Sequence, residues 1–207
     1  MRRFVLLAHR VPVDGQFTLN DLAGGGGRMD EVARAVSTAF TLSNDLRRDV
    51  EFSILFGAAP PPRARRIEIR GDRVRYLNPD ERSTAALLKN ALSRSSLLDQ
   101  DVESSPGLRV GPVDPLRELD RWARSPGALW LTEDGTPIDA WAPTDGSFVA
   151  ILSDPDDPSP EERSILDQAG TPKVSLGVRK LRTSQCIDLV HYAVDRRGAD
   201  RPTGRSS

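Results

Sequence analysis

The sequence places a glycine turn directly before a segment that carries its only cysteine. The turn is Ser175-Leu176-Gly177, and Cys186 lies in the helix predicted behind it. Such a turn lets the backbone wrap a small polar ligand, because glycine removes steric hindrance and a helix N-terminus offers unpaired N–H groups. One cysteine excludes an internal disulfide, and with His9 and His191 as the only histidines no zinc site is credible. This segment therefore favours ligand binding by backbone groups, without a metal.

A second cluster of chemically capable residues follows the first long predicted helix. Asp45, Arg47 and Arg48 stand close together there, beside Asn44. Two arginines flanked by carboxylates can hold a phosphate while a carboxylate orients the edge of a base. Composition alone favours a plainer interpretation, a salt-bridged helix terminus, since charge clusters are common at helix ends.

Strands and helices alternate along the chain and predict the scaffold for these groups. Apolar runs predict buried strands at residues 4–8, 49–56, 128–131, 148–152 and 173–175. Helical spacing and capping signals predict helices that begin near residues 28, 78, 114 and 159. Residues 66–70 and 74–76 are expected to pair as a hairpin across Gly71-Asp72.

This alternation predicts an α/β domain with a mainly parallel sheet and flanking helices. In such a sheet ligands bind at the carboxyl ends of the strands. The loops that follow Leu131, Leu152 and Ser175 are therefore expected to meet at one mouth.

The 207 residues fit one domain, expected at residues 1–196, and a tail at 197–207 without apolar periodicity that is expected to be disordered. No apolar run approaches the roughly 20 residues of a membrane-spanning helix, so we expect a cytoplasmic protein without a membrane partner. The net charge of −1 does not by itself indicate a nucleic-acid partner.

Two C-terminal motifs resemble a known family of RNA-modifying enzymes. Lys-Val-Ser-Leu-Gly at 173–177 and Ser-Gln-Cys-Ile-Asp-Leu-Val-His at 184–191 are similar to the knot motif of SPOUT-type methyltransferases, whose looped backbone holds S-adenosylmethionine. The resemblance implies a C-terminal trefoil knot, which the rule of unknotted connections would not predict. The cofactor-lining residues that it implies are Leu131, Ser153, Leu176, Gly177, Leu181 and Cys186. Ser153 departs from the family pattern, which usually has glycine there, and residues 155–157 are unusually acidic.

Further blocks narrow the resemblance to the tRNA pseudouridine N1-methyltransferase family. They are Gly-Arg-Met-Asp at 27–30, Ala-Phe-Thr-Leu-Ser at 39–43, Asp-Leu-Arg-Arg-Asp at 45–49 and Leu-Asn-Pro-Asp-Glu-Arg-Ser at 77–83. Asn44 stands where that family commonly has histidine. The resemblance implies a homodimer that transfers the methyl group of S-adenosylmethionine to N1 of a pseudouridine in the T-loop of tRNA, at position 54.

For that reaction we expect Asp30 or Asp45 to accept or orient the N1 proton. The residues expected to bind RNA are Arg28, Asn44, Arg47 and Arg48. The methyl donor is activated by its positive sulfur, so no nucleophilic side chain is required. Cys186 is accordingly expected to contact the cofactor or to pack in its helix, and not to form a covalent adduct.

Other functions remain open on the sequence alone. A methyltransferase of the same knot type could act on a pseudouridine in ribosomal RNA or in a free nucleoside, with the same cofactor site and a different RNA face. A non-catalytic RNA-binding module would be favoured if Ser153 and the acidic stretch after it blocked the cofactor.

Overall fold

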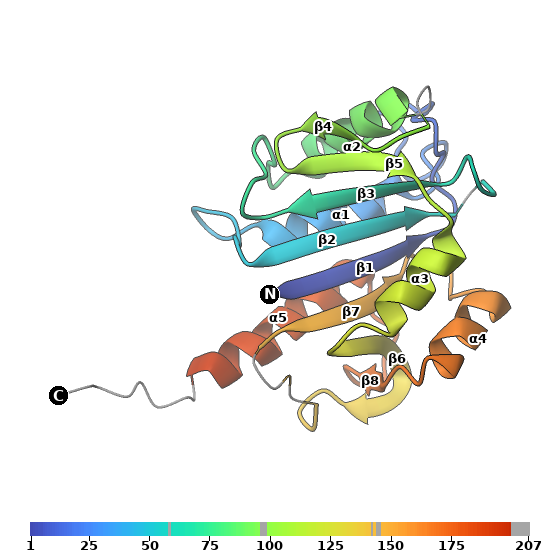
Figure 1. The fold of residues 1–207 in the computed structure, drawn as a ribbon. Coiled ribbons are helices and arrows are strands. Elements are labelled where there is room, and N and C mark those ends of the chain that lie inside the picture. The colour runs from blue at the N-terminus through green and yellow to red at the C-terminus, as the bar shows by residue number, and fades with distance from the viewer. Residues whose placement is uncertain (58, 96–98, 142, 144–145, 200–207) are drawn as a thin grey trace.

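The computed structural model describes the chain except residues 58, 96–98, 142, 144–145 and 200–207. Within the described residues a single sheet of eight strands has the order β4-β5-β3-β2-β1-β7-β6-β8 (Figure 1). The strands are β1 (Arg2–Ala8), β2 (Val50–Phe56), β3 (Arg65–Arg70), β4 (Val102–Ser105), β5 (Leu108–Pro112), β6 (Ala128–Pro137), β7 (Phe148–Ser153) and β8 (Lys173–Ser175). The helices are α1 (Met29–Phe40), α2 (Glu81–Ser95), α3 (Pro115–Ala123), α4 (Pro160–Gln168) and α5 (Thr183–Ala199).

Parallel pairing dominates the half of the sheet that contains the C-terminal strands. The strands β2, β1, β7, β6 and β8 are parallel to their neighbours in that order. The other half is antiparallel, through the pairs of β3 with β2, β3 with β5 and β4 with β5. The carboxyl ends of β1, β6, β7 and β8 therefore meet at one edge, which we call the carboxyl edge; the opposite edge of the sheet is the amino edge.

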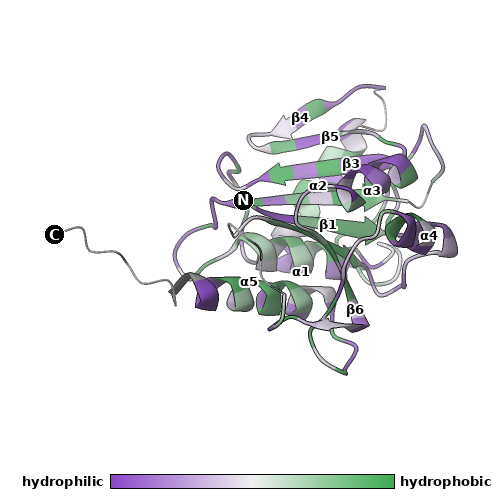
Figure 2. Ribbon diagram, turned by 60° about the horizontal axis from the view of Figure 1, so that its bottom comes forward, coloured by the Kyte–Doolittle hydropathy of each residue, from purple (hydrophilic) through white to green (hydrophobic). Residues whose placement is uncertain are grey.

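Helices cover both faces of the sheet, with α1, α2 and α5 on one face and α3 and α4 on the other (Figure 1). Successive side chains of a strand point to opposite faces. In β1, Phe4 and Leu6 pack with the core under α1, whereas Val5 and Leu7 pack with Leu119 of α3. A strand buried on both faces reads as a continuous apolar run, and Figure 2 shows β1 as hydrophobic and the surface helix α4 as largely hydrophilic.

The second half of β6 and the residue after it wrap closely around β8. Leu131 pairs with Val174, and after an irregularity Thr136 pairs with the same residue. The Ile138 N–H then donates to the Ser175 carbonyl at 2.9 Å. Between the two pairings, a Cβ on Gly135 would lie 2.5 Å from the Val174 nitrogen, so only glycine fits. This crossing lies in the C-terminal region where the family resemblance implies a knot.

The structure corrects three local expectations. Residues 74–76 do not pair with β3, whose antiparallel partners are β2 and β5, so the expected hairpin is wrong. The helix expected near residue 78 begins at Glu81, with the Asp80 carboxylate accepting from the Ser83 N–H at 2.7 Å. The predicted tail begins too early, because α5 continues to Ala199.

The Arg197 guanidinium explains the longer helix, since it donates to the carbonyls of Ile138 and Asp139 at 2.7 and 2.8 Å. The rest of the predicted tail, residues 200–207, lies outside the described residues. Among the described helices none is both long and apolar enough to cross a membrane.

Candidate functional site

A pocket of about 600 Å³ opens at the carboxyl edge. Its walls come from the middle of β6, the end of β7 and the loop after it, the segment before α5 and the first turn of α1. Leu131, Ser153, Leu181 and Cys186 line it, and a smaller adjoining hollow adds Leu176 and Gly177. The structure thus brings together all of the residues that the resemblance assigns to the cofactor. They converge because parallel strands end at the same edge of a sheet.

The turn after β8 presents bare backbone to this region. The Ser175 hydroxyl accepts from the Gly177 N–H at 3.1 Å and donates to the Glu133 carbonyl at 3.0 Å, which holds the turn in place. Gly177 has a φ of 130°, a conformation that disfavours other residues, and a Cβ there would meet no atom within 4 Å. The space beside this glycine is therefore open to a ligand.

Cys186 is half-buried at the start of α5 and has the chemistry of a packing residue. Burial, and next the charge of Glu133, raise the pKa of its thiol to about 11. At neutral pH the thiol is therefore protonated, and the thiol form is a poor nucleophile. This favours the contact role over covalent catalysis.

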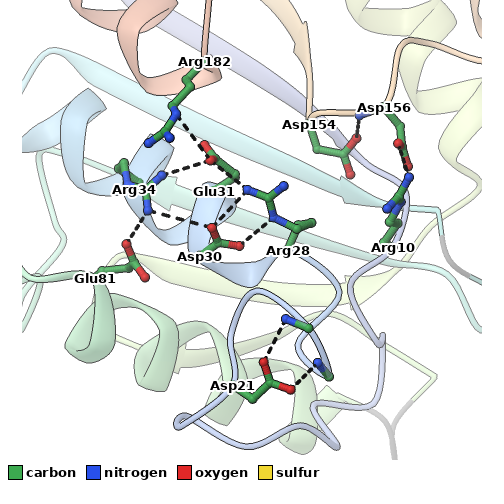
Figure 3. Close-up of polar contacts among 12 residues, drawn as sticks. Arg10, Asp21, Arg28, Asp30, Glu31, Arg34, Glu81, Asp154, Asp156 and Arg182 are labelled. Carbon is green, nitrogen blue, oxygen red and sulfur yellow. Dashed lines mark hydrogen bonds and ion pairs between the residues drawn. The ribbon is translucent and has the colours of Figure 1, made fainter.

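Arg28 is fixed at the pocket wall by two acidic residues of α1 (Figure 3). Its guanidinium donates to both oxygens of Asp30, at 3.0 and 3.1 Å, and to Oε1 of Glu31 at 2.9 Å. Burial raises the pKa of Asp30, but the hydrogen bond and charge of Arg28 outweigh burial and lower it. The bidentate pair therefore fixes the position and orientation of the Arg28 guanidinium beside the pocket.

Glu31 also lines the pocket, and sequence reasoning missed it. Its side chain is 5% exposed, and its Oε1 accepts from Arg34 at 3.0 Å as well as from Arg28. Its Oε2 is buried and has no hydrogen-bond partner within the part of the chain that the structure describes. Buried polar atoms are rarely left unpaired, so this oxygen marks a place where the pocket wall lacks a donor.

The other predicted RNA-binding residues, and the predicted proton acceptor Asp45 beside them, lie far from the pocket within one chain. Asn44, Asp45, Arg47 and Arg48 follow the C-terminal end of α1, whose 12 residues span roughly 18 Å. Arg47 pairs with Asp195 of α5 at 2.7 Å, and Arg48 pairs with Asp45 at 3.1 Å. The structure therefore places Arg28 and Asp30 at the carboxyl edge and this group at the amino edge.

The acidic loop after Ser153 does not block the pocket. Ser153, Asp154, Pro155, Asp157 and Pro158 all contribute to its wall. The Lys180 ammonium lies 2.6 Å from the Asp157 carboxylate and joins this loop to the segment before α5. The negative charge that looked unfavourable in the sequence is thus compensated by basic residues in the fold.

The two histidines are expected to titrate far from the ordinary value of 6.5, in opposite directions. Burial lowers the pKa of His9, but the hydrogen bonds and charges of Asp154 and Glu162 outweigh it and raise the pKa to about 10. Burial, and then the charges of Arg47 and Arg2, lower the pKa of His191 to about 4. NMR titration of the ring protons should show neither group with a midpoint near 6.5.

These shifts predict how stability changes with pH. A raised folded-state pKa makes the contribution of His9 complete below pH 6.5 and removes it as the pH rises towards about 10. For His191 the unfolded chain binds the proton first, so stability falls as the pH drops from 6.5 to about 4. In thermal unfolding, His9→Gln should flatten the alkaline limb and His191→Gln the acid limb. The reverse pattern would contradict the assignment.

Comparison with a solved structure first defines the class of fold. Nep1 of Archaeoglobus fulgidus, solved with S-adenosylhomocysteine bound, superposes with a TM-score of 0.66, covering 96% of this chain and 99% of Nep1 at 14% identity. The two chains share a fold, an α/β sheet with flanking helices of the knotted SPOUT type. The fold class expected from the sequence is therefore confirmed.

A family model then identifies the chain more narrowly. The model described as putative SAM-dependent RNA methyltransferase matches residues 1–199, and the chain belongs to this family. Among similar curated proteins, the tRNA (pseudouridine(54)-N(1))-methyltransferase of Methanocella arvoryzae is 42% identical, over 95% of this chain and all of the relative. The proteins of the same name from Methanosarcina mazei and Haloarcula marismortui are 38% and 37% identical, each over 97% of this chain and 94% and 100% of the relative.

Proposed function

We propose that this protein uses S-adenosylmethionine to methylate N1 of pseudouridine 54 in the T-loop of tRNA. Support comes from relatives of that name that match nearly the whole chain, up to 42% identity. The observation that carries the proposal is the position of Arg28, fixed at the wall of the pocket that the expected cofactor residues line. We further propose a single domain that acts in the cytoplasm, where tRNA is.

The pocket fits the proposed cofactor. Its volume of about 600 Å³ lies within the range of small-molecule sites. Leu131, Leu181 and Cys186 supply apolar surface, and Gly177 offers bare backbone with open space beside it. When bound, S-adenosylmethionine supplies a methyl group made electrophilic by a positive sulfur.

The residues of the chain have distinct parts in this proposal. Arg28 places a guanidinium donor where the base becomes anionic as its N1 proton passes to water or to the Asp45 carboxylate, which favours that loss. Asp30 acts through Arg28, because both of its oxygens accept from that guanidinium. The base must leave the T-loop stack to reach the pocket.

We also propose that the protein is a homodimer, that Asn44, Arg47 and Arg48 contact RNA from the amino edge, and that Asp45 beside them is the candidate acceptor of the N1 proton. One argument for the homodimer is distance: within a single chain these residues lie roughly the length of α1 away from the pocket, so a second chain is needed to bring them near it. The other is the exposed apolar surface of α5, where Leu189 is 39% and Tyr192 is 61% exposed. Aromatic and aliphatic side chains that are exposed together on a helix mark an interaction surface.

Tyr192→Glu is expected to convert a dimer into monomers, because a carboxylate in an apolar interface loses its hydration without gaining a partner. Light scattering after gel filtration would measure the mass. Tyr76→Glu is the matched control, since Tyr76 is 73% exposed and lies in the segment between β3 and α2 instead of on α5. An unchanged mass for Tyr192→Glu, or equal dissociation in both variants, would count against this interface.

A methyl-transfer assay tests the reaction. Labelled S-adenosylmethionine is supplied with T-loop stem-loops that differ only in uridine or pseudouridine at the target position. Transfer to the pseudouridine RNA alone supports the proposal. Cofactor binding without transfer to either RNA would favour another substrate, such as ribosomal RNA or a free nucleoside. Absence of cofactor binding as well would favour a knot that only binds RNA.

A further inference from the structure

The loop between β7 and α4 forms one wall of the pocket and carries Asp154, Asp156 and Asp157. Each of these carboxylates contacts a basic residue outside the loop. Asp154 contacts His9, Asp156 contacts Arg10 and Asp157 contacts Lys180. His9 and Arg10 directly follow β1, so the loop is tied to the neighbouring strand end as well as to the segment before α5.

His9 makes the most connections in this arrangement. Its backbone N–H donates to Oδ2 of Asp154 at 2.7 Å, and its ring Nδ1 lies 2.8 Å from Oδ1 of the same carboxylate. Its ring Nε2 lies 3.0 Å from Oε2 of Glu162 in α4. That Glu162 oxygen also accepts from the Ser159 N–H at 2.7 Å, which caps α4. One side chain therefore contacts both ends of the loop.

The geometry requires a charged ring. A neutral imidazole has one N–H and can donate to one carboxylate only, whereas both ring nitrogens of His9 face carboxylate oxygens. Both nitrogens must then donate, as in imidazolium. The raised pKa of His9 agrees with this reading. The other charged groups nearby are Arg10, Asp156 and Arg28, of which both arginines lie close enough to interact with Asp154.

We propose that His9 is a positioning residue of the cofactor site, which as imidazolium holds the β7–α4 loop against the end of β1 in the shape that binds S-adenosylmethionine. The proposal rests on the proposed function, because His9 would hold in place a loop that lines the same cofactor pocket. No atom of His9 itself belongs to the pocket wall, and its effect passes through Asp154 and Glu162.

Binding of S-adenosylhomocysteine, measured by calorimetry, tests the proposal. His9→Gln keeps a polar side chain but cannot donate to both carboxylates with a charge. It should weaken binding roughly tenfold, the effect of losing a charge-assisted hydrogen bond. In turnover the KM for the cofactor should rise while kcat changes little. His9→Arg offers a charged fork of donors and should restore much of the affinity.

His191→Gln is the matched control. His191 is also buried and hydrogen-bonded, but to Arg2 and Ala39 near the amino edge. This variant should lower the unfolding midpoint and leave cofactor affinity unchanged. If His9→Gln bound S-adenosylhomocysteine as tightly as the unmodified protein, the proposal would be overturned. It would also be overturned if His9→Gln and His191→Gln both lost affinity in proportion to their loss of stability.

Amide hydrogen exchange of the ligand-free protein separates this proposal from the proposed function. The N–H groups of Asp156 and Ser159 donate to the carboxylates that His9 contacts, at 3.1 and 2.7 Å. They should exchange faster in His9→Gln, and unchanged exchange would contradict the role of His9. If the unmodified protein does not bind S-adenosylhomocysteine, the proposed function fails, whatever the exchange of these amides shows.

Discussion

Gly135→Ala is expected to destabilise the protein by about 3 kcal/mol and to remove cofactor binding with it. The added methyl group would lie 2.5 Å from the nitrogen of Val174 and 2.6 Å from the carbonyl carbon of Lys173. These are backbone atoms of β8, so no side chain can rotate away, and the strand itself must move. Because β8 leads into the turn at Gly177, the displacement reaches the pocket.

Differential scanning calorimetry would measure the effect, and a fall in the unfolding midpoint on the order of 10 °C is expected for a chain of this size. Gly57→Ala is the control, because a Cβ there would meet only the Ala8 carbonyl oxygen at 4.0 Å. An unfolding midpoint for Gly135→Ala that matches Gly57→Ala would show that β8 is not packed as tightly as the structure has it.

The strands of the parallel half could be predicted because each is a short apolar run buried on both faces. The strand pairing in the antiparallel half of the sheet was harder to predict. The pairing of β3 with β5 joins residues about 40 positions apart, such as Ile67 and Val110, and no local pattern specifies such a partner. The turn signal at Gly71-Asp72 predicted a hairpin between residues 66–70 and 74–76. The structure has the turn, but residues 74–76 do not form a strand that pairs with β3.

Some residues of the site could likewise be placed from the local sequence, and others only from the tertiary structure. Leu131, Ser153 and the turn at Gly177 could be placed together because their strands run parallel. The helix predicted between Asp30 and Asp45 already separates them, but which edge of the sheet each end of that helix reaches required the structure. Glu31 carried only a weak signal, an acidic residue in a first helical turn, where the helix dipole already favours one.

The acidic loop shows why charge in a sequence can mislead. The stretch from Asp154 to Asp157 reads as a barrier to a ligand held by backbone, but its basic partners come from elsewhere in the chain. His9 is 145 residues from Asp154 and 153 from Glu162. A lone histidine after a strand gives no sign of that arrangement, which becomes visible only when β1 and β7 lie side by side.

Arg28→Lys is expected to reduce kcat for methyl transfer on the order of 100-fold, the effect of losing one well-placed donor to a developing negative charge. Lysine keeps the positive charge, but its single ammonium cannot donate bidentately to Asp30 while contacting Glu31. The charge would remain near the pocket without a fixed direction, and correct direction is what transition-state stabilisation requires.

Single-turnover kinetics with the pseudouridine stem-loop would measure this step, with calorimetry of S-adenosylhomocysteine as the second readout. Cofactor affinity should change by less than about threefold, because Arg28 is expected to act on the base. Arg124→Lys is the matched control: Arg124 donates to both oxygens of Asp120, at 2.9 and 3.0 Å, on the exposed surface of α3. A loss of cofactor affinity as large as the loss of kcat would place Arg28 on the cofactor, and the acidic residues that hold it would then serve binding instead of proton removal.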